Sequence, residues 1–172
     1  MDVTKENTKG MNLDDEDDEE DESQENRFLT FGIATEIYGI SILSVVEIIR
    51  LVKIVNIPQS LPFIKGIINL RGKIIPVMSI RKRFDLTEKE FDDRTCIIVV
   101  NIKGVDIGLI VDKVSEVLEI PSDKVEAMPQ IGNSGHQRFV KGIGKIGDEV
   151  KILLDLDKLL FEEELEKIKT LK

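Results

Sequence analysis

Apolar residues alternate with polar or small residues over much of the chain, in short runs separated by turn-forming residues. The runs are rich in Ile and Val and are bounded by Gly, Pro, Asn and Asp, a pattern typical of β-strands. The predicted strands cover residues 28–33, 36–40, 53–57, 63–70, 73–80, 95–102, 105–111, 117–120, 139–143 and 150–154. So many short strands at this spacing predict a mainly β fold, built as a small barrel or sandwich.

Two segments have helical features. Ser41 can cap a short helix near residues 42–49, and Ser44 with Glu47 has capping-box spacing, although the β-branched content shortens such a helix. A second helix is predicted near residues 156–170, where apolar residues share one face and acidic residues precede basic ones, as the helix dipole prefers.

The chain contains an internal repeat. Residues 63–67 (FIKGI) match residues 139–143 (FVKGI) at an offset of 76, and the match continues without a gap to Phe84 and Leu160. Upstream, residues 39–48 match residues 108–117 at an offset of 69, so the second half carries a longer loop, expected within residues 128–138. The repeat predicts two similar lobes with a groove or a shared core between them.

Charge divides the chain into segments. The formal net charge is −9, but residues 1–26 hold 12 acidic and two basic residues, a net of −10, and residues 27–172 are close to neutral at +1. We therefore expect a disordered acidic tail over residues 1–26. A folded domain follows over residues 27–160, and residues 161–172 form a C-terminal helical extension.

Composition excludes several functional classes. One cysteine and one histidine exclude a disulfide framework, a multi-cysteine metal site and any two-histidine metal site. No apolar run reaches the ~18 residues of a transmembrane helix, so a soluble, intracellular protein without membrane insertion is expected. A folded part of net +1 lacks the basic field that nucleic-acid binding needs. No cofactor is expected.

Individual motifs point away from catalysis. The glycines of residues 142–147 fit a dinucleotide-binding pattern, but Asp148 and Glu149 follow at once and then a strand, so a hairpin turn is the better interpretation. Cys96 lies in an apolar run and is expected to pack in the core. Asp106 and Asp112 flank an apolar strand and are interpreted as solvated strand ends. No nucleophile–base pair is present, so an enzyme is not expected.

Two charged residues remain open to two interpretations. Arg71 lies between two apolar strands at a predicted turn, and Glu47 lies among Val45, Ile48 and Ile49. They are either ordinary solvated charges, which contribute little energy, or the orienting charges of an interaction surface.

Three segments carry a highly specific combination of residues, namely 36–40 (EIYGI), 63–72 (FIKGIINLRG) and 108–118 (GLIVDKVSEVL). Together with further matches spread over residues 27–160, they resemble the bacterial chemotaxis coupling proteins of the CheW family.

The resemblance implies two five-stranded SH3-like barrels around a shared apolar core. It also implies a non-enzymatic, cytoplasmic adaptor recruited to receptor arrays. Such an adaptor joins the cytoplasmic tips of methyl-accepting chemoreceptors to the regulatory domain of a CheA-type histidine autokinase. By position, the receptor- and kinase-coupling surfaces would include Val45, Glu47, Gly66, Arg71 and Val117.

Some features depart from the family or leave alternatives. Ser41 and Ser79 stand where the family commonly has Asp, and both can still cap a helix or turn. A coupling module in a non-flagellar chemosensory pathway is an alternative, and a small-barrel RNA-binding protein is a less favoured one. Fusion to a response-regulator receiver is not expected, because no such extension follows.

Overall fold

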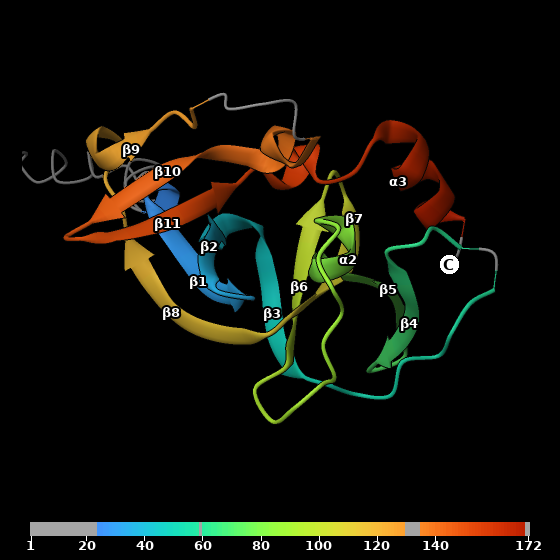
Figure 1. Cartoon of the computed structure of the whole chain (residues 1–172). Helices are drawn as coiled ribbons and strands as arrows, with labels where there is room; N and C mark the ends of the chain where they lie inside the picture. The colour runs from blue at the N-terminus through green and yellow to red at the C-terminus, as the bar shows by residue number, and fades with distance from the viewer. Residues whose placement is uncertain (1–23, 59, 130–134, 171–172) are drawn as a thin grey trace, which may run out of the picture.

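The computed structural model describes residues 24–58, 60–129 and 135–170, and its β-strands form two sheets (Figure 1). The predicted acidic tail lies almost wholly outside these residues. The strands are β1 (Arg27–Ile33), β2 (Glu36–Ser41), β3 (Val45–Arg50), β4 (Ile64–Leu70), β5 (Lys73–Ser79), β6 (Cys96–Ile102), β7 (Val105–Val111), β8 (Lys113–Glu119), β9 (Val125–Glu126), β10 (Val140–Ile146) and β11 (Glu149–Leu154). The helical elements are η2 (Ile42–Ser44), α2 (Ile80–Arg83), η3 (Ser122–Lys124), η4 (Gly135–Phe139), η5 (Leu156–Lys158) and α3 (Glu162–Lys169).

The two sheets define two lobes with equivalent strand orders. Lobe I has the order β8-β1-β2-β11-β10-β9, and lobe II has the order β3-β6-β7-β5-β4. Under the sequence repeat, β8, β1, β2, β11 and β10 correspond in turn to β3, β6, β7, β5 and β4. The mainly β, two-lobe prediction is therefore confirmed, with the two-residue β9 as an additional strand in lobe I.

Strand registers repeat along with the order. In lobe II, β5 pairs in parallel with β7 through Val77 and Gly108, and in lobe I their counterparts Leu153 and Gly39 pair in the same way. The hairpins β4–β5 and β10–β11 both have a register shift, just before Gly66 and Gly142 respectively. The sequence repeat is thus also a structural repeat.

Each lobe combines strands from both halves of the chain. The strands β1 and β2 belong to the first repeat, but they pair within lobe I with β8 and β11 of the second. The strand path crosses from lobe I to lobe II between Ser41 and Val45, and returns at Asp112 between β7 and β8. Neither lobe can therefore form from one repeat alone.

A shared apolar core joins the lobes. The largest cluster of buried side chains combines Phe31 and Ile40 of lobe I with Ile98 and Leu109 of lobe II. Two smaller clusters fill the individual lobes, one around Val77 and one around Leu153, which are repeat counterparts. Burying a large apolar side chain contributes roughly 1.5–3 kcal/mol, so this core is the main force that holds the lobes together.

The helix predicted near residues 42–49 is wrong. Only the single 3₁₀ turn η2 forms, with the Ser41 hydroxyl accepting the Leu43 N–H at 3.2 Å, and β3 follows as an antiparallel partner of β6. Burial alternates residue by residue along β3, which is the period of a strand. Its β-branched Val and Ile residues favour the extended backbone over a helix.

The predicted C-terminal helix is interrupted. It begins as η5, capped by Asp155, and resumes as α3, in which Leu165 and Ile168 are buried in the shared core. Glu164 accepts the backbone N–H of Phe161 at 2.7 Å and binds both terminal nitrogens of Arg83 at 2.7 and 3.0 Å. α3 is therefore firmly docked, whereas a domain boundary at residue 160 stays a prediction.

Candidate partner-binding surface

Glu47 and Arg71, which sequence analysis left open, form an ion pair. Glu47 lies on β3, the first strand of the lobe II sheet, and Arg71 lies in the turn of the β4–β5 hairpin at its other end. Arg71 (φ 53°) and Gly72 (φ 86°) both have positive φ, the signature of a type I′ turn, and the Asn69 side chain accepts the Gly72 N–H at 2.8 Å. The turn thus holds the Arg71 guanidinium on Glu47.

This ion pair is available to solvent. The Arg71 side chain is 71% exposed and that of Glu47 is 28% exposed. The hydrogen bond that Arg71 donates to the Glu47 carboxylate, together with the negative charge of Glu47, raises the pKa of Arg71, so the guanidinium stays charged. An exposed pair of this kind adds little to the free energy of folding. A partner could therefore form its own contacts with these two charges at little cost in stability.

Gly66 has a clear structural role. It is buried with φ 149°, and a Cβ there would lie 2.1 Å from the Val55 carbonyl oxygen. The close approach lets Val55 and Ile67 exchange two backbone hydrogen bonds of 2.8 and 2.9 Å, which adds a short extra pairing beside β4. Packing alone requires glycine here, and a role of Gly66 in partner binding stays a prediction.

Val45 and Val117 lie on equivalent edge strands of the two lobes. Val45, on β3, is half-buried against the shared core, whereas Val117, on β8, is 49% exposed. The repeat counterpart of Val117 is Ile48 on β3, which is 44% exposed. Both edge strands therefore present apolar side chains to solvent, as an interaction surface would.

Part of this apolar surface was not predicted from the sequence. Leu43, Val46 and Ile48 are 55%, 53% and 44% exposed, and all three lie in the segment predicted to be helical. A helix would have scattered these side chains around its axis, whereas the strand places Val46 and Ile48 on one face. Residues 45–50 (VVEIIR) do not alternate between apolar and polar residues, so their β-branched content was the one sequence signal that favoured a strand here.

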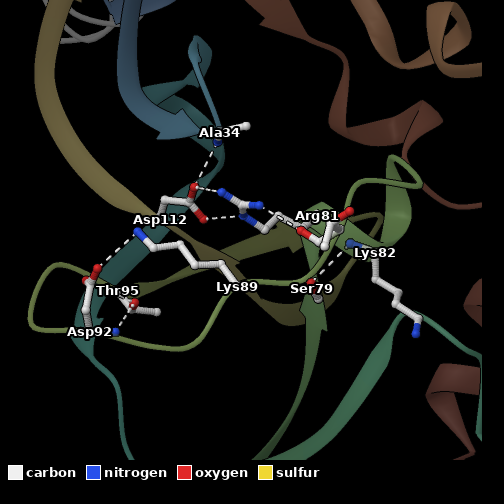
Figure 2. Close-up of polar contacts among 9 residues, drawn as sticks. Ala34, Ser79, Arg81, Lys82, Lys89, Asp92, Thr95 and Asp112 are labelled. Carbon is white, nitrogen blue, oxygen red and sulfur yellow. Dashed lines mark hydrogen bonds and ion pairs between the residues drawn. The ribbon is translucent and has the colours of Figure 1, made fainter.

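Asp112 and Asp106 are not the solvated strand ends that the sequence predicted. Figure 2 shows the Asp112 carboxylate between the Arg81 guanidinium, which donates two hydrogen bonds, and the backbone N–H of Ala34. Asp106 accepts from the Asn101 amide at 2.9 Å and pairs with Lys73 at 2.5 Å. The alternation of apolar and polar residues could not reveal the ion-pair partners Arg81 and Lys73, which are 31 and 33 positions away.

Other sequence motifs have structural explanations. The glycine-rich stretch of residues 142–147 runs along β10 into the β10–β11 turn, where Gly147 has φ 60°, so the hairpin interpretation is confirmed. Cys96 is half-buried and packs against the shared core. Ser79 caps α2 by accepting the Lys82 N–H at 3.1 Å, as expected of a residue at a family Asp position.

Two further observations concern the described residues only. Within them, no three His, Cys, Asp or Glu side chains gather in a way that could hold a metal ion. Over the same residues, no helix is long and apolar enough to cross a membrane.

Comparison with known proteins identifies the family. The family model of the CheW-like domain matches residues 27–164. The chemotaxis protein CheW of Klebsiella aerogenes is 35% identical over 138 residues, which cover 80% of this chain and 83% of that protein. The chemotaxis protein CheW of Treponema pallidum is 29% identical over 149 residues, covering 84% of this chain and 88% of that protein.

A solved structure has the same fold. The crystal structure of the scaffolding protein TtCheW from Thermoanaerobacter tengcongensis superposes with a TM-score of 0.74 at 39% identity. The match covers 81% of this chain and 94% of that one. The matched region includes both lobes, so the chain belongs to the CheW-like domain family of chemotaxis proteins.

Proposed function

We propose that this protein is a non-enzymatic chemotaxis adaptor that couples chemoreceptors to a CheA-type histidine kinase. The observation that carries the proposal is the family match over residues 27–164, which takes in every strand of both lobes. An adaptor needs surfaces for two partners rather than a catalytic centre. The apolar edge strands and the exposed Glu47–Arg71 pair are two such surfaces.

The edge strands β3 and β8 suit the receptor. The cytoplasmic tip of a chemoreceptor is a helical hairpin, and a helix presents an apolar stripe through positions i, i+3, i+4 and i+7. Val45 and Val117, with the newly recognised Ile48, offer apolar contacts on both lobes beside the shared core. An aspartate in place of one of these apolar residues would leave a carboxylate without a partner in the desolvated contact with the receptor.

The Glu47–Arg71 pair suits the kinase regulatory domain. It lies at the end of lobe II where the β4–β5 turn approaches β3, so it is held on rigid elements. Two opposite charges in fixed positions can orient a partner whose charges are complementary. Glu47 lies on β3 itself, so this surface adjoins the proposed receptor contact, and Arg71 reaches it from the β4–β5 turn. A kinase domain that approached from this turn would leave the outer face of β3 to the receptor, so that both partners could bind at once. The adaptor would then stay in the cytoplasm at receptor arrays.

A charge exchange tests this proposal sharply. Arg71→Glu alone should weaken kinase or receptor binding at least about tenfold. The double variant Glu47→Arg/Arg71→Glu restores the internal ion pair but reverses the charges that a partner meets. If the pair orients a partner, the double variant stays defective; full recovery of binding and of receptor-dependent kinase activation would overturn that assignment.

Val45→Asp and a matched control complete the experiment. Val45→Asp should abolish receptor-dependent kinase activation while the thermal melt stays cooperative. The exchange Glu166→Lys/Lys169→Glu reverses another exposed ion pair, on α3, and should leave binding unchanged. If purified kinase and a receptor fragment fail to bind the parent protein as well, the adaptor function itself is wrong.

A further inference from the structure

The two lobes differ in what covers them after the last hairpin of each repeat. After β11, the chain continues through η5 into α3, which stands beside lobe II next to β4 and β5 (Figure 1). After β5, the chain continues through α2, the repeat counterpart of η5, and residues 84–95 then contain no helix. Residues 86–93 are the sequence counterpart of α3, so lobe I lacks the helical cover that lobe II has.

The missing cover leaves a cavity on lobe I. It measures about 240 Å³ and is lined mainly by apolar side chains from β2, β10, β11 and the connection after α2, and also by Met128 and Gln137 from the segment before β10. The lining residues that matter here are Tyr38, Val140, Ile152, Leu154, Phe84 and Leu86. Tyr38, Val140 and Ile152 are only half-buried, although they face the apolar cavity.

The equivalent residues of lobe II are covered. The counterparts of Tyr38, Val140 and Leu154 are Ile107, Ile64 and Met78, and all three are buried to 5% exposure or less. They belong to the same buried cluster as Leu165 and Ile168 of α3, and Ile64 lines a cavity together with Ile168. On lobe II, therefore, the apolar face of an amphipathic helix completes the surface.

We infer that the lobe I cavity binds an amphipathic helix of a partner protein, in the manner in which lobe II holds α3. Such a helix would insert two large aliphatic side chains one turn apart, as Leu165 and Ile168 do in α3. The structural repeat carries the argument, because the strands beneath the two positions have the same order and register. The cavity is lined from β2, β10, β11 and the connection after α2, and no residue of the edge strands β3 and β8 lines it. This binding is therefore independent of the proposed receptor contact.

A helical peptide is the direct probe. A peptide of residues 159–172, with a hydrocarbon staple joining the exposed positions 163 and 167, presents the α3 face already folded. Fluorescence anisotropy with the full-length protein should show saturable binding. Changing Leu165 and Ile168 to Asp within the peptide should weaken binding at least about tenfold, because the cavity would then receive unpaired carboxylates.

Two variants of the protein locate the binding site. Leu86→Asp changes the cavity wall, whereas Phe91→Asp changes a comparably exposed apolar residue in the same connection that lies outside this cavity. Leu86→Asp should weaken peptide binding at least about tenfold, and Phe91→Asp should change it less than about twofold. Thermal melts of both variants show whether they are folded. If Leu86→Asp does not fold, the peptide with Asp at positions 165 and 168 still tests the inference on the parent protein.

Several results would overturn the inference. Absence of saturable binding at millimolar peptide would do so, as would equal loss of binding in the Leu86 and Phe91 variants. Binding that ignores the Asp substitutions in the peptide would show a non-specific contact. A concentration-dependent dimer of the parent protein that Leu86→Asp dissociates would show instead that a second copy occupies the cavity.

Discussion

Arg81 and Asp112 form a bidentate ion pair at the junction of the two lobes. The Arg81 Nε donates to one carboxylate oxygen at 2.8 Å and its Nη2 to the other at 2.6 Å, and both side chains are largely buried. The backbone N–H of Ala34, in the β1–β2 turn of lobe I, donates to the same carboxylate at 2.8 Å. Because Asp112 is the residue where the chain returns from lobe II to lobe I, this contact fixes one lobe relative to the other (Figure 2).

We predict that Asp112→Asn loosens this junction. The substitution keeps the size of the side chain but removes its charge and one acceptor, so the free energy of unfolding should fall by about 1.5–3 kcal/mol. Urea denaturation measures this change. Arg81→Lys keeps the positive charge but loses the fork geometry, and should also destabilise. A variant as stable as the parent would show that the junction is held by the apolar core alone.

The same carboxylate should make stability depend on pH. Burial by itself would raise the pKa of Asp112, but the hydrogen bonds from Arg81 and Ala34 and the charge of Arg81 lower it on balance below 3.8. A lowered pKa in the folded state adds stability above the unfolded-state pKa, and that stability is lost as the pH falls through the folded-state pKa. The stability difference between the parent and Asp112→Asn should therefore shrink below about pH 4. A constant difference from pH 6 to pH 3 would contradict this.

The sequence repeat predicted the two-lobe fold because equivalent segments of the two repeats carry the same strand and turn signals. The hairpins β4–β5 and β10–β11 were both found, since each carries the same apolar alternation. β3 was missed because Ser41 and the Ser44–Glu47 spacing imitate the start of a helix, and only pairing with β6 decides for a strand. Tertiary contacts override such local signals.

Contacts between distant residues could not be predicted from the sequence. Arg83 and Glu164 are separated by 81 positions, and Arg81 and Asp112 by 31, so no local pattern relates them. The repeat also could not reveal that β1 and β2 pair with strands of the other half, since two equal units can fold separately or exchange strands. The Glu47–Arg71 pair likewise forms only because the lobe II sheet curls until β3 meets the β4–β5 turn at its other end.

Gly66→Ala should destabilise the fold more than Gly72→Ala. Both glycines have positive φ, but a Cβ at Gly66 would lie 2.1 Å from the Val55 oxygen, whereas nothing lies within 4 Å of one at Gly72. We expect about 1 kcal/mol for Gly72→Ala from backbone strain, and at least about 3 kcal/mol for Gly66→Ala, which adds a backbone clash. Denaturant unfolding of both variants tests this. Equal effects would mean that the segment around Val55 yields without cost.

The docking of α3 should depend on Glu164 but not on its neighbour Glu163. Glu164 binds the partly buried Arg83, whose guanidinium also lies 4.3 Å from the ring centre of Phe63, while Glu163 is exposed. Glu164→Gln should lower the free energy of unfolding by about 1.5–3 kcal/mol and speed hydrogen exchange in α3. Glu163→Gln, the matched control, should change neither. Similar exchange rates in both variants would show that Leu165 and Ile168 alone anchor the helix.

Tyr38, at the lobe I cavity, can be titrated without interference because the chain has one tyrosine and no tryptophan. Burial, and then the negative charge of Glu36, raise the pKa of its hydroxyl above 10.0. Absorbance of the tyrosinate should therefore rise at higher pH in the folded protein than in urea, where the midpoint lies near 10. Glu36→Gln should remove the smaller part of the shift.

The raised pKa of Tyr38 also fixes the direction of the change in stability. The unfolded chain loses the Tyr38 proton first as the pH passes 10, so stability contributed by the neutral hydroxyl is present below pH 10 and declines above it. If a helix binds the cavity, it desolvates the hydroxyl further, and the stapled peptide should shift the titration to still higher pH. A folded-state midpoint equal to that in urea would show that the ring is solvated, and a cavity that water fills so freely would have no apolar wall for a helix to cover.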